Sequence, residues 1–142
     1  MDIRALPSYP PPDPFIYLIP YCTTTLVFTN YRTQKKTDES LVALALRYAT
    51  TALFDHDFQA PMPSEEHVWR AGSVALVVEP AKERPDQELV LTWRLWHEAI
   101  TGLRDFTGAY PGERFMFAIY VPEIVKGEAE PTRVGKGTLG AD

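Results

Sequence analysis

The stretch ELVLTWRLWHEAITGLRDF, residues 88–106, decides the expected fold. Leucine and valine alternate over its first residues, which predicts a strand at 88–92. From Trp93 onward the apolar residues recur at spacings of three and four, which predicts a helix over 93–108 with Thr92 as its N-cap. Because a helix that begins directly after a strand must fold back over the sheet, this junction predicts a helix packed on a sheet.

Two tryptophans lie at that junction. Large aromatic side chains in the first turn can fill the wedge between helix and sheet, and each buried ring contributes about 2–3 kcal/mol of transfer free energy. We therefore interpret Trp93 and Trp96 as the main anchor of the fold. A ligand-stacking role is the alternative. His97 falls off the apolar stripe, so we expect it to be exposed at the rim.

A second helix is expected earlier in the chain. Thr37 or Asp38 can act as an N-cap, and acidic residues in the first turn suit the helix dipole. Leucine, alanine and tyrosine then recur at helical spacing, which predicts a helix over 38–55. Its broad apolar face predicts deep burial against a sheet.

The remaining ordered segments have strand composition. FIYLIPYCTTTLVFTNY is rich in aromatic and β-branched residues, and Pro20 cannot donate a hydrogen bond to a strand ladder, so we expect two strands that meet near it. A strand pair, or one strand bent at Gly72, is expected over HVWRAGSVALVVEPA. The expected strands are 15–19, 23–30, 67–81, 88–92 and 114–122.

The chain divides into three parts by composition. Residues 1–14 hold five prolines, which predicts an extended arm. Residues 15–122 form a single α+β domain. Residues 123–142 form a tail rich in glycine and charge, in which TRVGKGTL can add an edge strand. That segment opens no helix and lacks the spacing of a phosphate loop.

The element order predicts an α+β fold: an antiparallel or mixed sheet of about 4–6 strands with two helices on one face. The inner β-α-β-β-α-β part matches a ferredoxin-like, split β-α-β arrangement. The other sheet face must then meet solvent, a loop or a partner. We expect the following side chains on that face: Tyr17, Tyr21, Val78, Val90, Met116 and Tyr120. The binding residues predicted among them are Tyr17, Tyr21, Met116 and Tyr120.

Composition and charge exclude several classes of protein. The net charge is −5 and the basic residues are scattered, so we expect no nucleic-acid partner. No apolar run approaches the ~20 residues that span a bilayer, so we expect no membrane association. Cys22 is the single cysteine, which leaves no intramolecular disulfide. No leader pattern opens the chain, so we expect an intracellular, cytoplasmic protein if the chain is complete and a secreted one if a leader was removed.

Residues that could carry chemistry are few. We find no G-x-S-x-G, H-E-x-x-H or C-x-x-C pattern, and we expect no cofactor and no metal. Asp55, His56 and His67 could form a metal cluster only through the fold, because adjacent residues on a helix do not converge on one ion. Glu98 and Asp105 lie about two turns apart on the second helix, along an expected solvated face.

The order of motifs resembles a group of small α+β proteins frequent in filamentous fungi. The matching pieces are IPYCTTTLVF, the first helix, an apolar strand, LTWRLWHEAITGLRDF, FMFAIYV and RVGKGTL, and the resemblance as a whole extends over residues 15–139. Members of that group have no assigned function and usually begin with a secretion signal. The resemblance therefore implies a fold and leaves the compartment open.

Two classes of function remain. The first is a non-enzymatic binding or protein-interaction module, with a homodimer or another protein as its partner. The alternative is a small-molecule-binding protein or small enzyme, with a pocket between the open sheet face and the Pro-rich arm. A flat apolar patch of some hundreds of Å² favours the first, and a pocket with converging polar groups favours the second.

Overall fold

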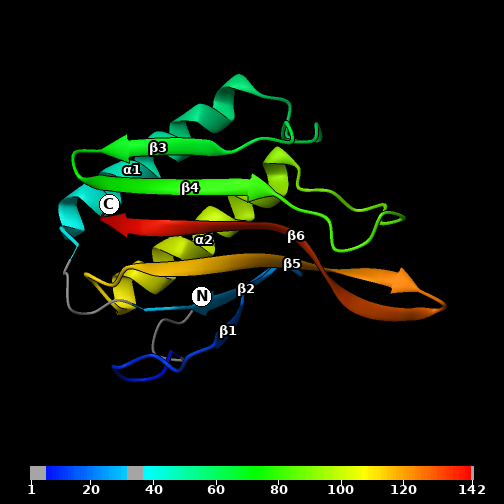
Figure 1. The fold of residues 1–142 in the computed structure, drawn as a ribbon, viewed down its shortest axis with the longest axis horizontal. Helices are drawn as coiled ribbons and strands as arrows, with labels where there is room; N and C mark the ends of the chain where they lie inside the picture. The colour runs from blue at the N-terminus through cyan, green and yellow to red at the C-terminus, as the bar shows by residue number, and fades with distance from the viewer. Residues whose placement is uncertain (1–5, 32–36, 142) are drawn as a thin grey trace.

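A computed structural model describes residues 6–31 and 37–141 (Figure 1). Along the described chain, three pairs of strands are separated by two α-helices. In order they are β1 (Phe15–Leu18), β2 (Thr25–Thr29), α1 (Glu39–Ala52) with the short 3₁₀ helix η2 (Leu53–Asp55), β3 (His67–Ala71), β4 (Val74–Pro80), α2 (Trp93–Ala109), β5 (Phe115–Val125) and β6 (Glu128–Ala141).

The strands form one open sheet in the order β1-β2-β5-β6-β4-β3, with every neighbouring pair antiparallel. Figure 1 shows α1 and α2 together behind one face of this sheet. The predicted α+β class, with two helices on an antiparallel sheet, is therefore confirmed. Strands β4 and β5 run parallel with β6 between them, so β4, α2 and β5 make one split β-α-β unit. A ferredoxin-like order would place β2 beside β4, but β5 and β6 separate them, so that finer assignment is not confirmed.

Both predicted helix caps are present. The carboxylate of Asp38 accepts a hydrogen bond of 2.8 Å from the backbone N–H of Ser40 at the start of α1. The hydroxyl of Thr92 accepts one of 3.2 Å from the N–H of Leu95 at the start of α2. Because the first-turn N–H groups of a helix have no partner inside it, these side chains fix where each helix begins.

Trp96 anchors α2 to the sheet, as predicted. Its indole is fully buried, and it stacks with Trp69 of β3 and Phe117 of β5 at ring-centroid distances of 5.7 and 6.3 Å. Trp93 is also buried, under the loop that follows η2. His97 is exposed, as expected. One side chain therefore joins two strands and a helix, which is the packing expected of a main anchor.

The strand predicted at 88–92 is wrong. Both neighbours of β4 are already in place, so the sheet has no edge there for another strand. Other groups bond this backbone instead: the N–H of Leu89 donates to Glu123, and the carbonyl of Leu91 accepts from the N–H of Met62. Leu91 is buried in the core, so the alternating apolar pattern reflects burial rather than a strand ladder.

The tail, predicted to add at most an edge strand, forms the central strand β6. Its glycines explain the error, because they carry no side chain to mark a buried face. A Cβ at Gly137 would collide with the carbonyl oxygen of Val77 and lie 2.5 Å from the ring of Phe117. The absence of a side chain therefore lets β4, β5 and the aromatic core close around β6. The domain consequently extends beyond residue 122.

The described part of the Pro-rich arm, residues 6–14, lies against the C-terminal end of α2. The hydroxyl of Tyr110 donates a 2.6 Å hydrogen bond to the carbonyl of Pro7, and Leu6 packs against the core. Within residues 6–31 and 37–141, neither helix combines the length and apolar content needed to cross a bilayer.

Candidate functional site

Figure 1 shows no helix packed over the sheet surface turned away from α1 and α2, here called the open face. Paired residues on neighbouring strands share a face, so the strand register defines its members. They are Ile16, Leu18, Thr25, Val27, Thr29, Val68, Arg70, Ala75, Val77, Glu79, Met116, Ala118, Tyr120, Arg133, Lys136 and Thr138.

One half of the open face, on β1, β2 and β5, is apolar. Ile16 and Leu18 are 66% and 62% exposed, and Met116 is 45% exposed. Val27 pairs with Ile16 on one side and Ala118 on the other, which makes a continuous apolar row across three strands. Apolar side chains grouped in this way favour contact with another molecule over contact with water.

The other half of the open face is basic. Arg70, Arg133 and Lys136 lie on β3 and β6, and Arg114 lies just before β5. Among the residues assigned to this face, Glu79 of β4 is the single acidic one. Its Oε1 lies 4.0 Å from Nζ of Lys136. A locally basic surface on a chain of net charge −5 is a feature that an acidic partner would recognise.

Two of the four predicted binding residues lie on the open face. Met116 is exposed there, and Tyr120 is half-buried. Tyr21 is 96% exposed but lies in the turn between β1 and β2, with a φ of 66°. Tyr17 was placed on the wrong face, because its ring points toward α2 and its hydroxyl donates a 2.7 Å hydrogen bond to Asp105.

Two further residues were also assigned wrongly to the open face. Val78 is fully buried on the helix side of β4. Val90 lines a cavity of about 240 Å³ beside Met62 and Leu91, at the end of the sheet. The residues missed were Ile16 and Leu18. In FIYL all four side chains are apolar, so hydropathy could not tell which pair faces the core, although the wider aromatic rings at 15 and 17 favour burial.

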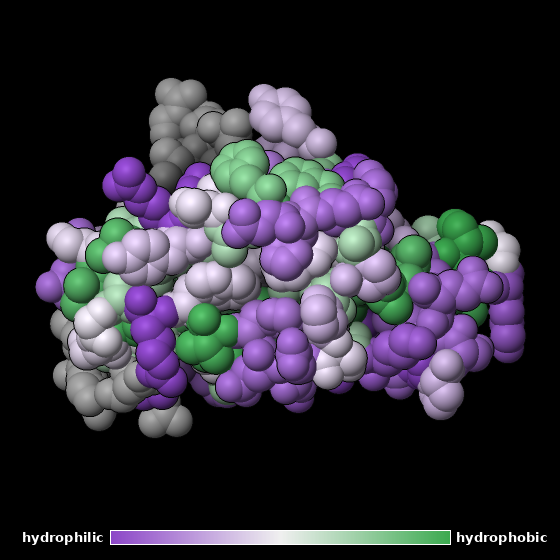
Figure 2. All heavy atoms as spheres, turned by 90° about the horizontal axis from the view of Figure 1, so that it is seen from above, coloured by the Kyte–Doolittle hydropathy of each residue, from purple (hydrophilic) through white to green (hydrophobic). Residues whose placement is uncertain are grey.

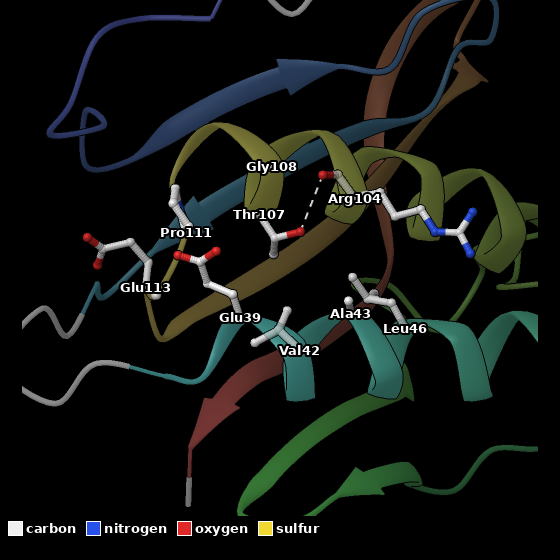
Figure 3. A pocket seen from close by; sticks show the side chains of 10 residues that line it. Glu39, Val42, Ala43, Leu46, Arg104, Thr107, Gly108, Pro111 and Glu113 are labelled. Atoms are coloured by element: carbon white, nitrogen blue, oxygen red, sulfur yellow. Dashed lines mark hydrogen bonds between the residues drawn. The ribbon is translucent and has the colours of Figure 1, made fainter.

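A groove of about 330 Å³ runs between α1 and α2 on the other side of the molecule (Figure 3). Val42 and Leu46 form its apolar wall, and Figure 3 shows Glu113 and Glu39 toward one end and Arg104 at the other. The guanidinium of Arg104 already donates a 2.8 Å hydrogen bond to the hydroxyl of Thr50. The groove between the helices can therefore accommodate an apolar group, and the Arg104 guanidinium at its end is already bound to Thr50.

Two of the three histidines, His56 and His67, contact the ring of Trp93. His56 stacks on the Trp93 indole at 3.7 Å, and His67 meets the same ring edge-on at 5.7 Å. His67 is further fixed through Nε2, which lies 3.0 Å from the carbonyl oxygen of Pro63. In residues 6–31 and 37–141, no three His, Cys, Asp or Glu side chains are grouped to hold a metal. Asp55 joins no such group.

Acidic residues of α2 hold the β1–β2 hairpin. Asp105 accepts from Tyr17, which, together with burial of the ring, raises the pKa of that phenol well above its usual value. Glu98 accepts a 2.5 Å hydrogen bond from Thr24. The prediction that Glu98 and Asp105 lie along a solvated face of α2 is therefore wrong.

Burial raises the pKa of the Cys22 thiol, which keeps it protonated and poorly nucleophilic at neutral pH.

Figure 2 shows the face of the molecule above β3, turned from the view of Figure 1. Hydrophobic side chains there form small separate groups among hydrophilic ones, so this edge offers no broad apolar surface.

Comparison of the chain with protein families, curated proteins and solved structures found no match. The resemblance to the fungal group accordingly stays a prediction.

Proposed function

We propose that this protein is a non-enzymatic interaction module that binds another protein through its open face. The observation that supports this proposal is the division of that face into an apolar half, with Ile16, Leu18 and Met116, and a basic half, with Arg133 and Lys136. A partner surface with apolar and acidic residues would match both halves.

The charge of the open face favours a different protein over a second copy of this chain. Among the described residues of this face, Glu79 is the one acidic side chain beside four basic ones, so a second copy offers few acidic groups to pair with them. A homodimer through the apolar half alone is the competing arrangement. Light scattering separates the two, since the proposal expects a mass of about 16 kDa at micromolar concentration.

The small-molecule alternative places a pocket between the open face and the Pro-rich arm. Residues 6–14 lie against α2, on the helix side, so the described arm does not cover that face. The alternative therefore depends on the groove between α1 and α2, whose charged lining residues are Glu39, Glu113 and Arg104.

A selection experiment tests the proposal without a known partner. Random peptides displayed on phage are selected on the wild-type protein and then tested on Met116→Asp, which places a charge in the apolar half, and on Arg47→Gln on the exposed side of α1. We expect the selected peptides to lose binding to Met116→Asp and keep it on Arg47→Gln. Equal binding to all three proteins would reject the open face as the binding surface.

A further inference from the structure

The open face has a small hollow at the start of β5. It measures about 130 Å³, the size of one side chain, and it is lined by Asn30, Arg114, Phe115, Met116 and Thr138. Its polar lining residues are Asn30, Arg114 and Thr138, and the side-chain amide nitrogen of Asn30 donates a 2.9 Å hydrogen bond to the Met116 sulfur. These are hydrogen-bond donors, so the hollow suits an acceptor, above all an anionic one.

The stem of Arg114 packs on the backbone of β6. It lies over Gly140, where a Cβ would come within 2.5 Å of the Arg114 Cγ. Arg84 pairs with Glu123, but Arg114 has no ion pair within the described residues. A guanidinium can engage a carboxylate through two N–H groups, and a packed stem reduces the conformational entropy that the side chain loses on binding.

A second hollow lies further along β5, at the base of the β5–β6 hairpin. It measures about 190 Å³, and its walls include Thr25, Tyr120, Pro122 and Pro131. Five of its eight lining residues are apolar or aromatic, and the other three are Thr23, Thr25 and Glu130. The hollow therefore suits an apolar side chain such as leucine or phenylalanine.

The positions of the two hollows limit the shape of the ligand. Met116 borders the first and Tyr120 the second, and they are four residues apart on one strand. At about 3.3 Å per residue these two residues are therefore about 13 Å apart. An extended peptide spans that distance in about four residues.

We infer that the open face binds an extended protein segment whose Asp or Glu side chain enters the Arg114 hollow while an apolar side chain enters the Tyr120 hollow. This inference rests on the proposed function, since it names the partner chemistry of the same face. The carboxylate accepts hydrogen bonds from Arg114 and Asn30, and the apolar residue packs against Tyr120.

Fluorescence anisotropy with labelled synthetic peptides tests the inference. The probe carries one Glu and one Phe, set four, five or six positions apart on a Thr-rich backbone. Its controls replace Glu by Gln or by phosphoserine. We expect the Glu peptide to bind wild type about tenfold more tightly than the Gln peptide. We expect Arg114→Gln to remove that preference, Arg114→Lys to restore part of it, and Arg47→Gln to leave it unchanged.

The outcomes separate this inference from the proposed function. If Glu and Gln peptides bind equally and Tyr120→Asp abolishes the binding of both, the open face remains the binding surface but the carboxylate hollow is rejected. If phosphoserine binds far more tightly than Glu, the anion is a phosphate and the inference is wrong. If no peptide binds, the inference is also rejected. Melting curves of each variant confirm that the comparison is made between folded proteins.

Discussion

The hydroxyl of Thr24 donates a 2.5 Å hydrogen bond to Oε1 of Glu98, 74 positions further along the chain. The other carboxylate oxygen of Glu98 faces Arg94 at 3.4 Å. Together with the bond from Tyr17 to Asp105, this contact ties the β1–β2 hairpin to α2. The hairpin carries the apolar half of the open face, so these hydroxyl–carboxylate contacts hold the proposed binding surface in position.

Replacing Thr24 tests that link. Thr24→Val keeps the side-chain volume but leaves a partly buried carboxylate oxygen without its donor. We expect the free energy of unfolding to fall by about 1–3 kcal/mol, measured by urea denaturation. Thr23→Val, at the adjacent exposed position, should change it by less than about 0.5 kcal/mol. Equal effects of the two variants would show that the Glu98 contact contributes nothing specific.

Trp96 should carry more of the stability than any exposed aromatic residue. Trp96→Ala leaves a cavity between β3, β5 and α2, and we expect a loss of about 3–5 kcal/mol. Phe54→Ala removes a ring that is 79% exposed and should cost far less. If Trp96→Ala does not fold, Trp96→Phe supplies the measurement with a smaller loss. A Trp96→Phe protein as stable as wild type would contradict the role of Trp96 as anchor.

The parts of the fold that could be predicted from sequence are those in which side chains carry the signal. Asp38 and Thr92 were found because capping needs a side-chain acceptor at a fixed position. The periodic apolar residues located α1 and α2 to within a few positions. β6 was predicted only as an edge strand, because two of its helix-side positions are glycines, Gly135 and Gly137, which have no side chain to mark a covered face.

Gly137 should tolerate no side chain. In Gly137→Ala the added methyl group would meet the Val77 carbonyl and the Phe117 ring, so β4 and β6 would have to separate. Contacts of this kind typically cost about 1–3 kcal/mol, and thermal unfolding would detect the loss. Thr138→Ala, on the open face of the same strand, serves as the control and should change stability little. An unchanged melting temperature for Gly137→Ala would contradict the close packing around β6.

Glu123 should make stability depend on pH in acid. The backbone N–H of Leu89 and the guanidinium of Arg84 bind its carboxylate and lower its pKa below the usual 4.5. The unfolded chain then binds the proton more readily, so this contribution to stability is present above pH ~4.5 and is lost as the pH falls through the folded-state pKa.

Denaturation of Glu123→Gln at several pH values measures this effect. We expect the variant to be less stable than wild type at pH 7, with the difference shrinking as the pH falls below 4.5. The exposed Glu128→Gln serves as a control, and its difference from wild type should stay small throughout. A gap between wild type and Glu123→Gln that is constant with pH would exclude the linkage.

The candidate site was predictable only in part. Met116 was correctly placed because strand alternation in β5 puts Phe115 and Phe117 on one face and Met116 on the other. Tyr17 was misplaced because the sequence does not show that its hydroxyl donates a hydrogen bond to Asp105, 88 positions further along the chain. Arg114 carried no signal at all, since its position depends on the Gly140 backbone beneath it and on the strand order.

Amide chemical shifts recorded during titration with the Glu- and Phe-containing peptide locate the surface that the peptide binds. If the peptide binds the open face, the largest shifts fall on β2, β5 and β6, at residues such as Val27, Met116 and Lys136. Shifts gathered on α1 and α2, around the groove of Val42 and Arg104, would contradict binding through the open face.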